Sequence, residues 1–148
     1  MKYKNLLIDT ANKIVQKGKG ILAADESNPT CGKRFDSIGV ESTFENRNEY
    51  RDMLITANGL EDYISGVIMF DETFRQSTTC DKKIIFPEYL SSKGIIPGIK
   101  VDKGAKDLAG FQDEKITEGL DGLRDRLSEY FELGARFSKW RAVLNIDE

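Results

Sequence analysis

Histidine is missing altogether from these 148 residues. A zinc site with histidine ligands, a Ser-His-Asp triad and a histidine general base are therefore excluded within this chain. Cysteine is scarce, and Cys31 and Cys80 are the only two in the sequence. We expect no disulfide framework, and a cytosol-like compartment fits this usage.

No apolar run approaches the ~18–20 residues of a membrane span. The N-terminus also lacks the apolar stretch of a signal peptide and the Arg/Ser-rich character of a transit segment.

An excess of one charge sign is also absent. The chain has 22 basic and 25 acidic residues, for a net charge of −3. Without a basic block, nothing points to nucleic acid or an anionic membrane as a partner. Hydrophobic residues make up 39% of the chain, which is enough to build a core. The length matches the roughly 150 residues of one domain.

Short apolar runs alternate with helical segments along the chain. Each run ends at a polar cluster, and Ser42 with Glu45 forms a capping-box pattern at one helix start. The spacing is that of successive βα units, which predicts an α/β fold with a parallel sheet. Strands are expected over residues 20–24, 64–70, 95–101 and 135–144. Helices are expected over 3–17, from Asn28 to near Gly39, from Ser42 onward, from Pro87 to Gly94, and over 116–133.

Two of these strands carry charged residues. Lys139 and Arg141 are two apart and share a face of the fourth run, and Lys100 and Asp102 repeat the pattern on the third. Strands of a parallel sheet are normally apolar throughout. Burying an unpaired ammonium costs several kcal/mol. If the sheet curves into a barrel, these side chains point inward, where they pair with each other or meet a charged ligand at the carboxyl ends of the strands.

Several of these residues have a plainer, structural alternative. Asp25 and Asp71 also fall at strand ends, and either can simply begin a helix. Lys100 can pair with Asp102 or with Asp25 for structure alone. Lys139 together with Arg141 is the hardest combination to explain structurally. The two cysteines have no base or ligand neighbour in the sequence, and we expect both to be inert.

The segment after the first strand has the features of a phosphate site. It opens a helix, and the free N–H groups of a helix start suit an anion. Nothing matches a Walker A loop or a dinucleotide fingerprint. With Lys100 and Arg141, the segment predicts an electropositive pocket beside Asp25. Its hydroxyls and cations are those of Ser27, Thr30, Lys33 and Arg34.

Four segments in register carry a resemblance to a known family. They are residues 18–27 (GKGILAADES), 98–104 (GIKVDKG), 119–123 (GLDGL) and 137–141 (FSKWR). In order and spacing they resemble class I fructose-bisphosphate aldolase, over about residues 6–146. Residues 63–66 and 76–78 are more similar to the plastid and bacterial branch than to the animal one.

The resemblance implies a (β/α)8 barrel that cleaves fructose 1,6-bisphosphate to dihydroxyacetone phosphate and glyceraldehyde 3-phosphate through a lysine Schiff base. It implies no metal and no other cofactor. The implied partners are the sugar bisphosphate and the triose phosphates, with no nucleic acid and no membrane. It also implies a homo-oligomer when complete, in the cytoplasm or, alternatively, in a plastid.

The resemblance also assigns roles to individual residues. Asp25 is the aspartate that handles the proton of the substrate C4 hydroxyl. Lys139 assists formation and dehydration of the carbinolamine. Thr30 stands where serine is common in the family, so it keeps the hydroxyl and adds a methyl group. The implied substrate-binding residues are Ser27, Thr30, Lys33, Arg34, Lys100 and Arg141.

A barrel of this type needs at least ~200 residues. We therefore interpret residues 1–148 as the N-terminal half of the barrel domain, with the first four βα units, and expect the Schiff-base lysine to lie beyond them. Taken alone, such a fragment is expected to be inactive. The alternatives are a non-catalytic half-barrel that binds phosphate or a protein partner, and a different Schiff-base lyase on the same barrel.

Overall fold

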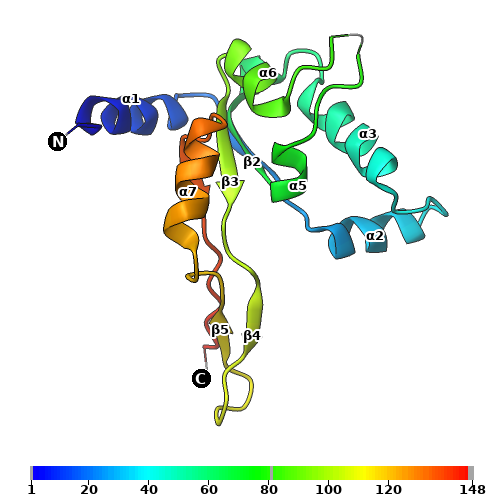
Figure 1. Cartoon of the computed structure of the whole chain (residues 1–148), viewed down its shortest axis with the longest axis vertical. Coiled ribbons are helices and arrows are strands. Elements are labelled where there is room, and N and C mark those ends of the chain that lie inside the picture. The colour runs from blue at the N-terminus through cyan, green and yellow to red at the C-terminus, as the bar shows by residue number, and fades with distance from the viewer. Residues whose placement is uncertain (1, 81, 147–148) are drawn as a thin grey trace.

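The computed structural model describes residues 2–80 and 82–146. A four-stranded parallel sheet with the order β1-β2-β3-β6 forms its centre (Figure 1). Helices lie on the connections between consecutive strands of this sheet, which confirms the predicted α/β organisation. The strands are β1 (Gly20–Ala24), β2 (Ile64–Met69), β3 (Ile96–Lys100) and β6 (Phe137–Lys139).

Four of the five helices expected from the sequence, α1, α2, α3 and α6, begin within two residues of the predicted starts. The Thr43 hydroxyl accepts from the Asn46 amide at 3.1 Å, one residue after the predicted cap at Ser42. The preceding helix begins at Asn28, and Ser27 is its N-cap. The helices are α1 (Lys4–Ile14), α2 (Asn28–Asp36), α3 (Phe44–Ile55), α4 (Leu60–Tyr63), α5 (Asp71–Phe74), α6 (Phe86–Ser92) and α7 (Leu123–Glu132).

The core lies between one face of the sheet and the helices that cover it. Val67 and Met69 of β2 are completely buried, and Ile99 of β3 is 1% exposed. They pack with Phe74 and Phe86 in one cluster of buried side chains. Since side chains alternate along a strand, the residues between them belong to the opposite face of the sheet. That opposite face holds the candidate site.

An antiparallel hairpin that the sequence patterns did not predict projects from the sheet. Its strands are β4 (Ala105–Asp107) and β5 (Lys115–Thr117) (Figure 1). The helix predicted over 116–133 begins only at Leu123. Gly119 and Gly122 explain the difference, because both have positive φ and so interrupt a right-handed helix. At Gly119 an added Cβ would also lie 2.9 Å from the Lys103 amide nitrogen.

The fourth strand is shorter than predicted. Only Phe137–Lys139 of the run 135–144 forms β6, and the amide of Val101 makes the next bond, 3.1 Å to the Lys139 carbonyl. The strand stops because the chain that follows β3 pairs with the residue after β5 instead, where the Lys103 amide donates to the Glu118 carbonyl at 2.8 Å. The prediction that Arg141 lies in this strand is therefore wrong.

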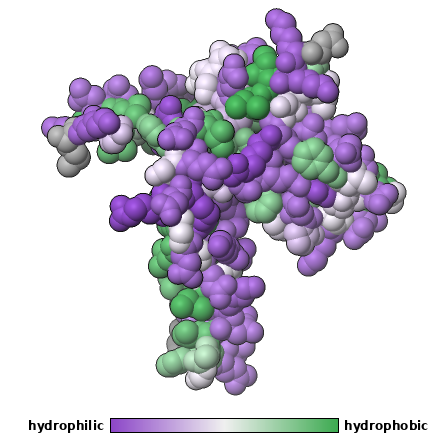
Figure 2. All heavy atoms as spheres, in the orientation of Figure 1, coloured by the Kyte–Doolittle hydropathy of each residue, from purple (hydrophilic) through white to green (hydrophobic). Residues whose placement is uncertain are grey.

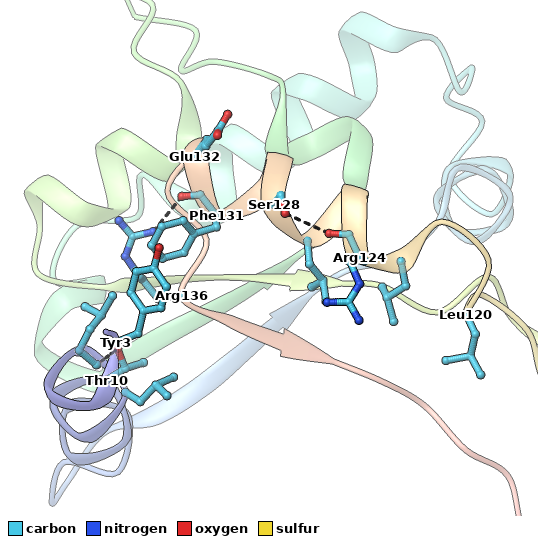
Figure 3. Close-up of a pocket in the computed structure, with 12 residues that line it drawn as sticks. Tyr3, Thr10, Leu120, Arg124, Ser128, Phe131, Glu132 and Arg136 are labelled. Atoms are coloured by element: carbon cyan, nitrogen blue, oxygen red, sulfur yellow. Dashed lines mark hydrogen bonds between the residues drawn. The ribbon is translucent and has the colours of Figure 1, made fainter. Parts of the chain in front are cut away.

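Helix α1 forms as predicted, but none of its residues is fully buried. A groove of about 960 Å³ runs between α1 and α7 (Figure 3). In this groove the rings of Tyr3 and Phe131 contact edge to face, with their centroids 5.9 Å apart. Figure 2 shows hydrophobic side chains along α1 and on the projection that the hairpin and the C-terminal segment form together, within a mostly hydrophilic surface. Among the described residues, no helix has the length and apolar character needed to cross a membrane.

Candidate functional site

An ion pair joins the two edges of the sheet. The Lys139 ammonium at the end of β6 lies 2.7 Å from an oxygen of Asp25, which directly follows β1. Strands β1 and β6 are the outer strands of the sheet. In a flat sheet, three strand spacings would separate them by about 14 Å. The sheet must therefore curve, and Asp25 and Lys139 meet over its concave face.

Glycines on the central strands make room for an aromatic ring beside this pair. Phe137 is the register partner of Gly98. A Cβ added at Gly98 would lie 2.2 Å from the Phe137 ring, and one added at Gly66 would lie 3.2 Å from it. Phe137 and Lys139 are two residues apart and share a face. The Phe137 ring therefore packs on the glycine backbone of β2 and β3, on the same face of the sheet as Lys139.

Lys100 adds a second ammonium on the neighbouring strand. It is the register partner of Lys139. Its nitrogen lies 2.8 Å from a carboxylate oxygen of Asp102, whose side chain is 1% exposed. Asp102 also accepts from the backbone amides of Gly104 and Arg141. Each lysine thus has its own carboxylate, and of the two structural partners considered for Lys100, Asp102 is the one in contact.

Burial and hydrogen bonding act in opposite directions on Asp102. Burial by itself would raise the pKa of this carboxyl. The hydrogen bond and the charge of Lys100, together with the two backbone amides, outweigh burial and hold the pKa below its ordinary value. Asp102 therefore supplies a fixed negative charge beneath the Lys100 ammonium.

The start of α2 brings two hydroxyls together. The Ser27 and Thr30 oxygens are 3.1 Å apart, with Ser27 at the N-cap. A cavity of about 580 Å³ has Ser27, Lys100 and Asp102 among its lining residues. The predicted phosphate segment and the predicted strand-end cation therefore border one common space.

The remaining predicted cations are more peripheral. Lys33 is exposed, and the Arg34 side chain is 53% exposed. Arg34 forms an ion pair with Glu26 and donates to the Tyr50 hydroxyl at 2.8 Å. The Arg141 side chain is exposed beyond the end of β6, and only its backbone reaches Asp102.

Asp71 has contacts that suit its structural alternative. It is the first residue of α5, and it accepts from Arg75 at 3.0 Å and from the Tyr130 hydroxyl at 2.8 Å. These contacts connect α5 with α7. Among residues 2–80 and 82–146, no cluster of three or more His, Cys, Asp or Glu side chains is arranged to hold a metal ion.

Sequence reasoning missed two residues that border the site. Glu26 follows Asp25 in the polar cluster after β1, but its neighbours along the chain do not reveal its partner. That partner is Arg51, which is 2% exposed and ion-paired with Glu26. One signal was available, since Arg51 precedes the buried Ile55 by four residues and so lies on the same helix face.

Comparison with known proteins places this chain in a family. The family model described as fructose-bisphosphate aldolase class-I matches residues 6–148. A probable fructose-bisphosphate aldolase class 1 of Xylella fastidiosa (strain Temecula1) is 59% identical over 142 residues, which are 96% of this chain and 42% of the relative. The chloroplastic fructose-bisphosphate aldolase 1 of Chlamydomonas reinhardtii is 55% identical over 145 residues, 98% of this chain and 38% of the relative.

A solved structure agrees with the sequence matches. It is fructose-bisphosphate aldolase from Plasmodium falciparum in complex with TRAP and a small-molecule inhibitor. The two folds superpose with a TM-score of 0.92 at 51% identity, over 99% of this chain and 42% of that one. The chain thus spans about two fifths of the length of the relatives it matches. Bacterial and chloroplastic relatives are both among them, in line with the branch suggested by the motifs. The four motifs, the parallel sheet and the family match agree, and the chain belongs to the class I fructose-bisphosphate aldolase family.

Proposed function

We propose that this chain supplies the Asp25–Lys139 half of a class I aldolase active site. The complete enzyme would cleave fructose 1,6-bisphosphate to dihydroxyacetone phosphate and glyceraldehyde 3-phosphate through a lysine Schiff base. The observation that carries the proposal is the 2.7 Å contact between Asp25 and Lys139 at the carboxyl edge of the sheet. Active sites of α/β barrels lie at this edge.

The proposed roles follow from the chemistry of each group. When the carbon–carbon bond of the Schiff-base intermediate breaks, its electron pair moves toward the iminium nitrogen, and the adjacent hydroxyl loses its proton as the aldehyde forms. In this proposal the Asp25 carboxylate accepts that proton. The Lys139 ammonium can donate a proton when the carbinolamine loses water. The two groups touch, so a proton can pass between them without crossing bulk solvent.

The substrate phosphates are assigned to the surrounding cations and hydroxyls. In this proposal Ser27 and Thr30 present hydroxyls at the start of α2, where backbone N–H groups favour an anion. Lys100 borders the same cavity as Ser27, which supports its role as a substrate contact. Lys33, Arg34 and Arg141 are exposed and able to approach a bound phosphate from solvent.

The finer architecture belongs to the same proposal. Residues 1–148 would form the N-terminal half of the barrel domain, with the first four βα units, and the Schiff-base lysine would lie on a later strand. The curvature that brings Asp25 to Lys139 supports closure into a barrel. We further propose that the complete protein is a homo-oligomer that acts in the cytoplasm, with a plastid as the alternative.

Borohydride trapping tests this function in the protein expressed from its complete gene. Incubation with dihydroxyacetone phosphate and borohydride should leave a reduced adduct on a lysine outside residues 1–148, and the purified protein should cleave fructose 1,6-bisphosphate. An adduct on Lys100 or Lys139 would overturn the roles given to them. Phosphate binding without any adduct or cleavage would favour the non-catalytic half-barrel instead.

A further inference from the structure

A buried arginine lies directly behind the loop that carries the candidate site. Arg51 is in the middle of α3 and is 2% exposed. Arginine is almost never this deeply buried unless it is paired. Its guanidinium donates to the Glu26 carbonyl at 2.7 Å and to the hydroxyl of Thr73 at 3.2 Å, and it forms an ion pair with the Glu26 carboxylate. Both terminal nitrogens of the guanidinium thus contact one residue, Glu26.

That residue, Glu26, stands between Asp25 and Ser27 in the chain. Its two carboxylate oxygens face different partners. One oxygen accepts from buried Arg51, and the other accepts from exposed Arg34. Glu26 therefore connects the interior of the molecule to a cation that the proposed function assigns to a substrate phosphate.

The two kinds of contact have separate consequences. The bond to the Glu26 carbonyl fixes the backbone from which Asp25 and Ser27 project. The bond to the carboxylate fixes the anion that orients Arg34. A substrate phosphate that arrives beside Ser27 would then meet an Arg34 that Glu26 already orients, on a loop that Arg51 holds in place.

Electrostatics keeps Glu26 suitable for this role. Burial by itself would raise the pKa of its carboxyl, but the hydrogen bond and charge of Arg51, with a further contribution from Arg34, hold the pKa below its ordinary value. Glu26 is therefore an anion at neutral pH and remains attractive to both arginines.

We infer that Arg51 is a positioning residue for phosphate recognition, acting through Glu26 on the Asp25–Ser27 loop and on Arg34. The inference rests on the proposed aldolase function. It concerns a residue that cannot touch substrate, because the guanidinium is enclosed by α3, the loop after β1 and α5.

The experiment compares two arginines of the same helix in the protein expressed from its complete gene. Arg51→Lys keeps the charge and loses the forked contact with Glu26. Arg47→Lys is the matched control, because Arg47 pairs at 2.7 Å with Glu72 and not with Glu26. We expect R51K to lower kcat/KM for fructose 1,6-bisphosphate by about tenfold to a hundredfold, mostly through KM. R47K should stay within about twofold of wild type.

A merely structural role predicts a different pattern. It would reduce the amount of folded protein and therefore the apparent kcat, with KM unchanged. That pattern, or equal KM changes in R51K and R47K, overturns the inference. Glu26→Gln is the second variant in case R51K folds poorly. It should raise KM as well, and the E26Q/R51K double variant should be no worse than the poorer single variant, since both act through one contact.

Phosphate binding separates this inference from the proposed function. If the wild-type protein shows no cleavage, the proposed function fails, and calorimetric titration with inorganic phosphate then decides the role of Arg51. The inference requires weaker phosphate binding by R51K than by wild type and R47K. Equal binding by all three proteins, including no binding by any of them, overturns it.

Discussion

Gly98→Ala tests the packing that shapes the concave face of the sheet. An added Cβ would lie 2.2 Å from the tip of the Phe137 ring and 2.5 Å from both adjacent ring carbons. Ordinary carbon–carbon contact is about 3.5–4.0 Å. The ring must therefore move by more than about 1 Å or the strands must separate. Overpacking of this kind typically costs about 1–3 kcal/mol, and we expect a loss of stability in that range.

Urea denaturation measures this cost as a lower midpoint with an unchanged m-value. Gly20→Ala is the matched control, since Gly20 is also a strand glycine and an added Cβ there meets nothing within 4 Å. Its backbone has no positive φ, so the control should be neutral or slightly stabilising. A Gly98→Ala protein within about 0.5 kcal/mol of wild type would refute the argument that the Phe137 ring depends on bare backbone.

Three further predictions concern charged and titratable groups. Lys139→Met should lower fructose 1,6-bisphosphate cleavage by about 10²–10⁴-fold, and near-normal turnover would remove Lys139 from the mechanism. The pKa of Glu26 is below its ordinary value in the fold, so its stabilisation is present above pH 4.5 and lost as the pH falls through the lower folded value. Denaturation at a series of acidic pH values should show that the free energy of unfolding falls less steeply with decreasing pH in Glu26→Gln than in wild type. An equal pH dependence in both proteins would contradict this. Burial and the hydrogen bond to Asp71 raise the pKa of Tyr130 from 10.0 to about 12. This neutral phenol therefore stabilises the fold below pH 10, and the contribution is lost towards pH 12 at up to about 1.4 kcal/mol per pH unit. Tyr130→Phe should remove that slope in alkaline denaturation, and an equal slope in both proteins would count against it.

The parallel sheet was predictable because its signals are local. Each apolar run is short and ends at a polar cluster, and helices fill the intervals between them. Three strand positions are correct to within about one residue, as for residues 20–24, whereas the fourth run is much too long. The length of an edge strand depends on how far its neighbour remains available, and the chain after β3 pairs with Glu118 instead. Nothing in the sequence of the fourth run indicates where its neighbour stops being a partner.

The hairpin was missed for a related reason. Leu120, Leu123 and Leu127 repeat at helical spacing, and the pattern extends back to Ile116. Two glycines interrupt it, and their positive φ angles allow the chain to turn where a helix would otherwise continue. Apolar periodicity alone does not distinguish a strand followed by a turn from the first turns of a helix. The helix can begin only after the second of these glycines, at Leu123.

In the candidate site, the sequence indicates at which edge of the sheet a side chain lies but not which side chains touch. Strand-end position predicted that Asp25 and Lys139 lie at the same edge of the sheet, although 114 residues separate them, but it did not predict that they pair. Their direct contact requires curvature, which depends on how side chains fill the concave face. Phe137 lies over Gly98 and Gly66 there, so that two missing side chains on β2 and β3 make room for a ring on β6. The strand carrying that ring also carries the lysine. Substituting Gly98 would therefore disturb the packing beside the ion pair, and urea denaturation measures the cost of that disturbance without any substrate.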